Sequence, residues 1–297
     1  MQTLLPLLVS PGLIGVAHLL YLYLRTIWNP RLHNRTLDIL CNVLSTPLSF
    51  IMAITEVNID PQAIPHGSQG GPISNMPVLF FDVDDCLYPQ NARVREASFD
   101  LSNRYIEKRL GLSKEDIIQL RDEYHKNFGL IVEGLAYNHK IDPLEYNAMV
   151  DDSIALDSLI KPDPKLRRLL QDIDRSKVRL WLFTNAYVTH AKRVVRLLDI
   201  DDFFEGVIYC DYARVPLVCK PQAKMFEEAM RAAGVERNAD CYFIDDSFSN
   251  CRGAHEFGWT AIHLVEEGLP VPPSQASKHQ IQSLEELRKL FPYFFRE

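Results

Sequence analysis

The sequence predicts an α/β fold: a Rossmann-like parallel sheet with helices on both faces and an all-helical segment inserted after the first strand. Two observations lead to this prediction. From residue 160 onward, short apolar runs alternate with helical patterns, as they do in repeated βα units. A wholly helical block, residues 91–159, separates the first apolar run from those units. Such sheets bind ligands beyond the carboxyl ends of their strands.

The first predicted strand is residues 77–81, a short apolar run followed at once by acidic residues. It is typical of a buried parallel strand whose C-terminal end carries polar side chains. Residues 55–76 before it are rich in proline and glycine and predict a linker. The expected organisation is an N-terminal extension and linker (1–75), a catalytic core (76–90 plus 160–297) and a helical cap (91–159).

Helix-start signals mark the helical block. Ser113 precedes Asp116 with the spacing of a capping box and predicts a helix through about Tyr124. Asp142 followed by Pro143 predicts another helix start, with proline at the first helical position.

The remaining chain alternates between the two patterns. Helices are expected at residues 166–173, 188–198, 223–233 and 251–257, and strands at 178–183, 206–209, 241–244 and 261–265.

Residues 1–24 carry no formally charged side chain and are long enough to cross a bilayer. Arg25, Arg31 and Arg35 follow, which would place the downstream chain in the cytosol. The alternatives are an amphipathic or loosely ordered extension, or an upstream start codon. The expected localisation is therefore cytoplasmic, with or without a nuclear pool, or membrane-anchored facing the cytosol if residues 1–24 insert.

Bulk composition limits the partners. The net charge is −7 and no basic run stands out, which argues against a nucleic-acid partner. The six cysteines include no Cys-x-x-Cys pair, so no zinc ribbon is predicted. A small phosphorylated substrate is the expected partner, and the sequence predicts no oligomeric state.

Polar residues recur where the predicted strands end. They are Asp82, Asp84 and Asp85 after the first strand, Thr184 and Asn185 after the next, Lys220 just before a helix, and Asp245 and Asp246 after a later strand.

These groups resemble, in order and spacing, the four motifs of the haloacid dehalogenase-like hydrolase superfamily. The resemblance covers about residues 77–265 and identifies the block 91–159 with that superfamily's C1 cap. Acidic residues at strand ends are often only solvated loop residues or helix caps. Four motifs in register make that explanation much weaker than it is for any one of them.

The resemblance implies phosphoryl transfer. Asp82 would be the nucleophile and form an aspartyl-phosphate. Asp84 lies two residues on, so it leaves the strand end on the same side and would act as general acid and base. Thr184, Asn185 and Lys220 would contact the phosphoryl group.

Crowded carboxylates in this position predict a magnesium site. Like charges about 4 Å apart repel by a few kcal/mol at an effective dielectric near 20. A hard divalent cation relieves this, and oxygen-only ligands favour Mg²⁺. The expected ligands are Asp82, the backbone carbonyl of Asp84, and Asp246, with Asp245 direct or through water.

The sequence resembles one branch of this superfamily more closely, the fungal pyrimidine 5′-nucleotidase family. Its patterns are similar to residues 80–89, 144–147, 181–187, 209–212 and 219–221. The resemblance implies hydrolysis of nucleoside 5′-monophosphates, UMP and CMP, and hence a part in pyrimidine nucleotide catabolism. Asp85 departs from the asparagine often found in that branch, and Cys86 departs from the wider superfamily. Neither change removes a catalytic atom.

Tyr88, Asn91 and Asn138 are candidate substrate contacts, although Asn138 also fits a solvated helix end. Three other functions stay open. A broad-specificity or lysophosphatidic acid phosphatase would suit a membrane-proximal N-terminus. A phosphomutase would keep both aspartates. A catalytically inactive scaffold held at a membrane is the third, and the intact motifs argue against it.

Overall fold

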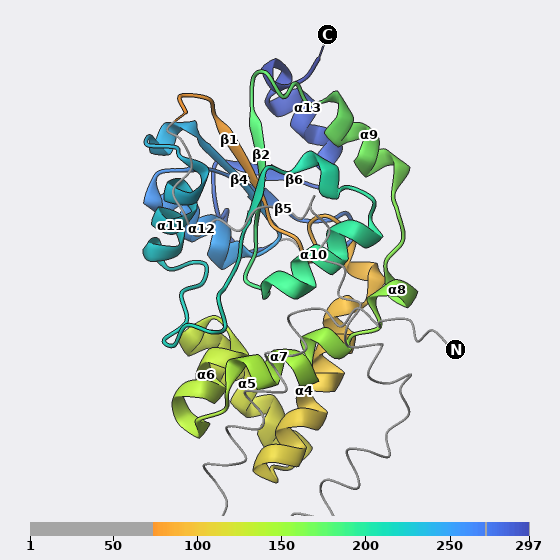
Figure 1. Cartoon of the computed structure of the whole chain (residues 1–297), viewed down its shortest axis with the longest axis vertical. Coiled ribbons are helices and arrows are strands. Elements are labelled where there is room, and N and C mark those ends of the chain that lie inside the picture. Colours follow the sequence, from red (N-terminus) through yellow and green to blue (C-terminus); the bar gives the residue numbers. More distant parts are fainter. Residues whose placement is uncertain (1–73, 271, 297) are drawn as a thin grey trace, which may run out of the picture. The chain divides into compact units, whose positions relative to one another are not determined.

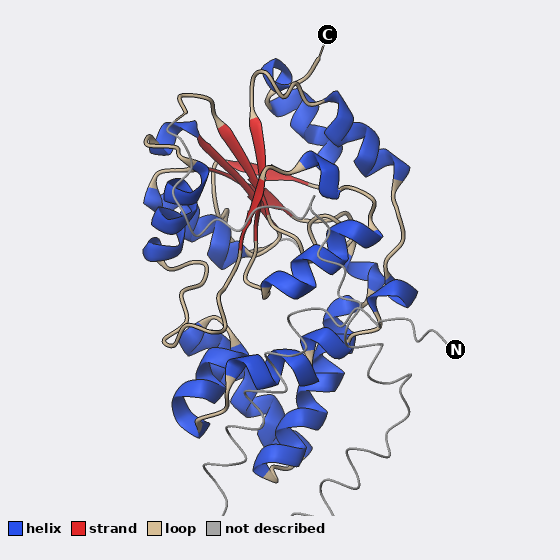
Figure 2. Ribbon diagram, in the orientation of Figure 1, coloured by secondary structure: helices blue, strands red, loops and turns tan. Residues whose placement is uncertain are grey.

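The computed structural model describes residues 74–296, apart from residue 271. A six-stranded sheet forms the centre of this part of the chain, with the strand order β3-β2-β1-β4-β5-β6 (Figures 1 and 2). Every neighbouring pair is parallel. The strands are β1 (Val78–Phe81), β2 (Arg179–Phe183), β3 (Gly206–Ile208), β4 (Cys241–Asp245), β5 (Thr260–Leu264) and β6 (His279–Ile281).

Both faces of the central strand β1 are buried, which explains why all four of its residues are apolar. Leu79 and Phe81 of β1 pack into one apolar cluster, and Val78 and Phe80 into another on the opposite face. The first face is covered by α9 (Pro164–Asp172), α10 (Val188–Leu197) and α13 (Leu287–Leu290). The second is covered by α11 (Ala223–Ala233) and α12 (Phe248–Phe257), as Figure 1 shows.

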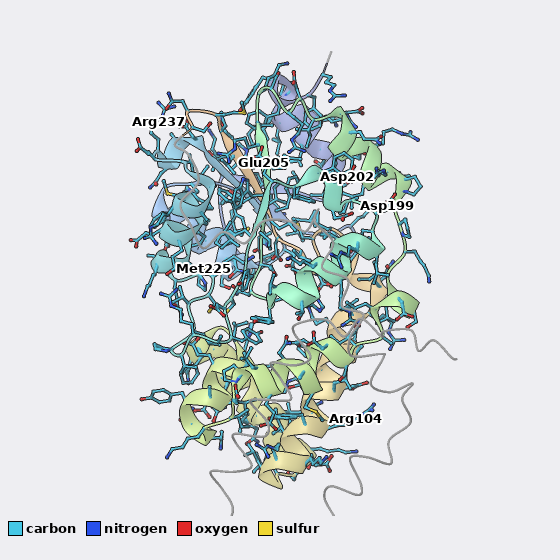
Figure 3. All side chains as sticks on the ribbon, in the orientation of Figure 1. Arg104, Asp199, Asp202, Glu205, Met225 and Arg237 are labelled. Carbon is cyan, nitrogen blue, oxygen red and sulfur yellow. The ribbon has the colours of Figure 1, made fainter. Side chains whose placement is uncertain are left out.

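Interactions at the amino ends of the strands fix the sheet on the side away from the acidic residues. Arg179, the first residue of β2, donates from Nε to Glu205 at 2.7 Å, just before β3 begins. Figure 3 labels Glu205 and, nearby, Asp202, which pairs with Arg167 of α9 at 3.1 Å.

A helical insert separates β1 from β2. It contains α4 (Val94–Leu110), α5 (Lys114–Phe128), α6 (Ile131–His139), α7 (Pro143–Met149) and the short α8 (Leu156–Leu159). Helices α4 to α7 share an apolar cluster, which includes Ile106, Ile117 and Leu135 and extends to Cys210 and Leu217 after β3. The insert is therefore packed on the loop between β3 and α11 as well as on itself.

The predicted helix starts are confirmed. The Ser113 hydroxyl accepts from the Asp116 amide at the start of α5, and Asp142 caps α7 with Pro143 at its first position. α5 runs on to Phe128 because it ends only at Gly129, whose φ of 82° favours glycine. Strand β6 was not predicted, because only Ile281 of its three residues is apolar and no apolar run marks it.

Among the described residues, no helix is long and apolar enough to span a membrane. The membrane prediction for residues 1–24 lies outside the described residues, as does nearly all of the predicted linker.

Candidate active site

The polar residues predicted at the strand ends meet at one edge of the sheet. β1 lies between β2 and β4, so Asp82 after β1, Thr184 after β2 and Asp245 at the end of β4 are neighbours. Asp82 and Thr184 line a cavity of about 600 Å³ there, together with Asp84, Lys220 and Asp246.

Lys220 lies between two of the carboxylates. Its ammonium donates to Asp82 Oδ1 at 2.7 Å, to Asp245 Oδ2 at 2.6 Å and to the Phe183 carbonyl at 2.7 Å. The side chain is buried, with 1% of its surface exposed. Burial lowers the pKa of Lys220, but the charges of Asp245 and Asp82 outweigh it and raise the pKa above its ordinary value. Lys220 is therefore a permanent positive charge.

Asn185 holds the backbone of Lys220. The Asn185 Oδ1 accepts from the Lys220 amide at 2.7 Å, and its Nδ2 donates to the Lys220 carbonyl at 2.9 Å. Asn185 was predicted to bind phosphate. The Asn185 side chain therefore places Lys220, and the second N–H of its Nδ2 and its backbone amide are left for a phosphate in the cavity that Asn185 lines.

Asp82, Asp245 and Asp246 form a carboxylate cluster in which one oxygen of each lies within 4.8 Å of the others. Asp245 is saturated, since besides Lys220 it accepts from the Ser247 amide at 2.7 Å and from the side chain of Asn250. Asp82 and Asp246 therefore have the greater capacity for a further ligand.

Negative charge in this cluster exceeds what Lys220 balances. Burial raises the pKa of Asp82 well above its usual value, Lys220 lowers it, and Asp245 and Asp246 raise it again. Burial and the charge of Asp245 raise the pKa of Asp246 to about 7. Clustered, partly desolvated carboxylate oxygens with surplus charge fit a hard divalent cation such as Mg²⁺.

Asp84 is held by two donors on the same oxygen. Tyr88 donates its hydroxyl to Asp84 Oδ1 at 2.5 Å, and Nε2 of His190 lies 2.7 Å from that oxygen. Burial raises the pKa of Asp84, but the charge of His190 and the two hydrogen bonds outweigh it, so the pKa is lowered. His190 was not predicted. Its only signal in the sequence is a polar residue on the apolar stripe of α10.

The helical insert contributes charge and an aromatic ring to the cavity. Arg95 of α4 pairs with Asp85 at 2.6 Å and with Asp246 at 2.8 Å. The Arg121 guanidinium lies 3.8 Å above the Phe99 ring, and both residues line the cavity. These insert residues were not predicted either.

Of the three predicted substrate contacts, Tyr88 lies beside the cavity, where it contacts Asp84, and the two asparagines lie outside it. Tyr88 is buried, and its hydroxyl donates to Asp84. Asn91 is exposed in a single 3-10 turn, and Asn138 is exposed on α6, where its amide donates to the Gly134 carbonyl. Neither asparagine is among the described residues that line the 600 Å³ cavity.

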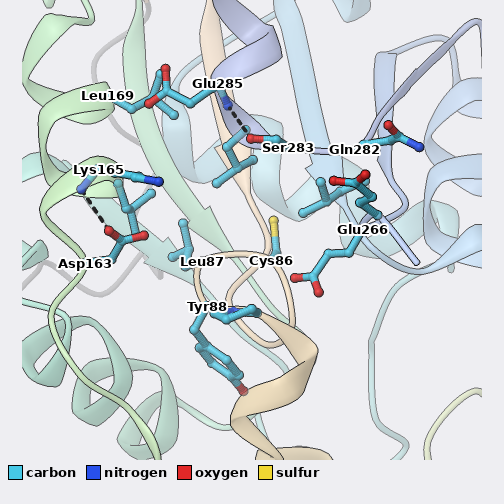
Figure 4. Close-up of a pocket in the computed structure, with 15 residues that line it drawn as sticks. Cys86, Leu87, Tyr88, Asp163, Lys165, Leu169, Glu266, Gln282, Ser283 and Glu285 are labelled. Carbon is cyan, nitrogen blue, oxygen red and sulfur yellow. Dashed lines mark hydrogen bonds between the residues drawn. The ribbon is translucent and has the colours of Figure 1, made fainter. Parts of the chain in front are cut away.

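A second cavity, of about 340 Å³, lies against the loop after β1 (Figure 4). Cys86 and Leu87 of that loop line it, and so do the capped starts of α9 at Asp163 and of the 3-10 turn at Ser283. None of the three cluster carboxylates lines it, so the chemistry belongs to the larger cavity.

Comparisons with known proteins agree with this geometry. A family model described as haloacid dehalogenase-like hydrolase matches residues 76–258. Phosphate metabolism protein 8 of Saccharomyces cerevisiae is 38% identical over 70% of this chain, which spans 66% of the yeast protein, just under two thirds of its length. Glyceraldehyde 3-phosphate phosphatase of Pyrococcus abyssi is 26% identical over 62% of this chain and 79% of that protein.

Among solved structures, the HAD phosphatase from Thermococcus onnurineus is similar with a TM-score of 0.51 at 19% identity. The match covers 73% of this chain and 98% of that one. At this identity the likeness shows the fold.

Proposed function

Because the chain belongs to the haloacid dehalogenase-like hydrolase family, we propose that it is a magnesium-dependent phosphomonoesterase with Asp82 as nucleophile. One observation carries the proposal. The Lys220 ammonium joins Asp82 to Asp245 at the carboxyl edge of the sheet, while Asp84, two residues on, is held in the same cavity. This arrangement provides a nucleophile, a counter-charge and an acid in one place.

The reaction has two steps. In the first, an Asp82 carboxylate oxygen bonds to phosphorus while the bond to the leaving oxygen breaks, and Asp84 gives that oxygen a proton. In the second, water attacks the aspartyl-phosphate, Asp84 takes a proton from it, and the bond between Asp82 and phosphorus breaks. Thr184 Oγ1 accepts from the Ala186 amide, which leaves its own proton free for a phosphoryl oxygen.

Asp82, Asp246 and the backbone carbonyl of Asp84 would hold Mg²⁺, and Asp245, whose oxygens are occupied, would reach it through water. The bound ion would neutralise charge on the cluster and on the phosphoryl group. Lys220 supplies the remaining positive charge. Its position does not depend on the ion, because Asn185 fixes its backbone.

The proposed substrates are nucleoside 5′-monophosphates, UMP and CMP. The motif resemblance supports this class, and the cavity suits it. Arg121, whose guanidinium covers one face of the Phe99 ring, offers hydrogen-bond donors to a base. Asp122 and His125 also line the cavity and offer polar contacts to a ribose or a base. The names of the archaeal relatives make a triose phosphate the alternative to test.

The test is a panel of UMP, CMP, AMP, sugar phosphates, glyceraldehyde 3-phosphate and lysophosphatidic acid, with Mg²⁺ and with chelator. We expect UMP and CMP to have the highest kcat/KM. Asp82→Asn should reduce phosphate release by at least about 10³-fold, because a missing nucleophile disables the whole mechanism. Chelator should reduce it by a similar factor, because the charge of the carboxylate cluster is then not neutralised. Asp100→Asn, on the exposed side of α4, is the control with the same chemical change.

The outcomes separate the alternatives. Equal activity across the panel would overturn the nucleotidase assignment and leave a broad-specificity phosphatase. Transfer between sugar positions without release would mean a phosphomutase. No release of phosphate from any ester with Mg²⁺ would overturn the enzyme assignment and favour an inactive scaffold.

A further inference from the structure

His190 is a buried histidine that the reaction as described above does not use. It lies on α10, whose capping residue Tyr187 directly follows the Thr184-Asn185-Ala186 segment. The side chain has 4% of its surface exposed. A histidine at such a position is often only a satisfied part of the core, but here its Nε2 contacts the predicted acid, Asp84.

The two oxygens of the Asp84 carboxyl differ in their hydrogen-bond partners. Tyr88 and His190 both occupy Oδ1, at 2.5 and 2.7 Å. Oδ2 makes no hydrogen bond to any described residue. The Asp84 side chain keeps 34% of its surface exposed and lines the catalytic cavity. Oδ2 is thus the oxygen available to a substrate.

Geometry also fixes the direction of the hydrogen bond. Oδ1 of Asp84 accepts a hydrogen bond both when the carboxyl is ionised and when it carries its proton on Oδ2, so Nε2 of His190 is the donor in both forms. Nδ1 of His190 is buried and has no partner among the described residues. The hydrogen bond to Asp84 is therefore the only one that the ring makes to a described residue.

We propose that His190 is a positioning residue, which clamps Oδ1 of Asp84 and turns Oδ2 toward the leaving-group oxygen. The inference rests on the proposed phosphomonoesterase function. As the P–O bond breaks, the proton on Oδ2 passes to the leaving oxygen and Asp84 becomes a carboxylate, whose charge the His190 N–H stabilises. In the second step Oδ2 takes the proton back from the attacking water.

This role predicts dependence on the leaving group. An alkoxide such as a ribose oxygen needs a proton in order to leave, whereas p-nitrophenolate is a stable anion that leaves without one. Loss of the clamp should therefore slow alkyl esters and spare p-nitrophenyl phosphate. A histidine that merely fills the core would affect both esters equally when replaced.

The experiment uses the full chain with Mg²⁺ and compares His190→Asn with His190→Gln. The glutamine amide occupies the place of Nε2 and can reach Asp84, whereas the asparagine amide corresponds to Nδ1 and cannot. Both replacements are polar, so their effects on folding are matched and are checked by thermal unfolding. His255→Asn, at an exposed position on α12, is the control.

For the best alkyl ester of the panel, we expect His190→Asn to lower kcat/KM by about 10- to 100-fold, part of the 10²–10⁴ that acid–base catalysis supplies. For p-nitrophenyl phosphate the change should stay below about threefold. His190→Gln should recover most of the loss. kcat/KM is the right measure because it includes leaving-group departure but not the later hydrolysis.

Equal losses for both esters, no loss for either, or failure of His190→Gln to recover activity would each overturn the inference. Wild-type enzyme that hydrolyses neither ester would instead overturn the proposed function, and that result needs no variant. The two failures are therefore distinguishable.

Discussion

Lys220 brings a positive charge to a place where two carboxylates meet almost without solvent. Asp82 and Asp245 both depend on it, and neither has another cationic side chain within ion-pair distance among the described residues. Burying three charged side chains together costs desolvation free energy. Removing one of the three costs more, because the remaining charges are left unpaired.

Lys220→Met should lower the free energy of unfolding by about 3–5 kcal/mol, the usual cost of breaking a buried ion pair. Urea unfolding at neutral pH in chelator measures it, with Lys224→Met, exposed on α11, as the control. Adding Asp245→Asn should recover part of the loss, since one unpaired charge disappears. A loss below about 1 kcal/mol for Lys220→Met would contradict this account.

At the scale of single residues, the sequence locates the groups that strand ends bring together. Asp82, Thr184 and the Asp245-Asp246 pair were predicted to meet because parallel strands end at one edge, and Lys220 was joined to them by the motif resemblance. The partners of these residues could not be predicted. Whether a side chain such as His190 turns toward Asp84 depends on how α10 packs, and no local pattern encodes that.

At the scale of elements, α4 links the helical insert to the carboxylate cluster. Arg95 leaves the second position of that helix and pairs with both Asp85 and Asp246. Half of its side-chain surface is exposed, so the contact can open without disturbing the core. Asp85 is thereby given a counter-charge.

Arg95→Met should strengthen Mg²⁺ binding by about three- to tenfold, that is by about 1 kcal/mol. The reason is that Asp246 loses a competing cation and the cluster becomes more negative. Titration calorimetry measures the dissociation constant. Arg104→Met, on the same helix at an exposed position, removes the same charge without this contact and should have no effect. Weaker binding in Arg95→Met would show that Arg95 supports the metal site instead of competing for it.

Element boundaries show what local patterns can and cannot fix. The capped starts of α5 and α7 were predicted, because Ser113 and Asp142 satisfy helix amides by local contacts. α12 begins at Phe248, three residues before the predicted position, since Ser247 caps it and the sequence there lacks an apolar stripe. The side of the insert that faces the cavity was not predictable, because it depends on tertiary packing.

At the scale of the whole molecule, folding raises the pKa values of several carboxyl groups. Burial raises the pKa of Asp246 to about 7, that of Asp151 to about 7 and that of Asp85 to about 6. Each binds its proton more tightly in the folded than in the unfolded chain, whose carboxyl pKa is about 4. Their contribution to stability is therefore greatest below that value and is lost as the pH rises through 6 to 7.

Stabilisation by Mg²⁺ should accordingly grow with pH. Protons and the ion compete for Asp246 and Asp82, so the rise in Tm on adding Mg²⁺ should be small near pH 5 and largest near pH 8. Thermal unfolding with Mg²⁺ and with chelator across this pH range measures the rise in Tm. Groups that do not contact the metal affect both Tm values equally, so their effects cancel in the difference. A Tm rise independent of pH would contradict a site built on these carboxylates.

The position of β1 in the middle of the sheet has a consequence for the order in which the protein folds. Both neighbours of β1 come later in the chain: β2 follows the whole helical insert, and β4 is later still. Joining such distant segments costs chain entropy before any pairing compensates for it, whereas helices of the insert form from local contacts. During synthesis, Phe80 and Phe81 emerge long before the strands that cover them. The catalytic centre is therefore among the last parts of the molecule to be completed.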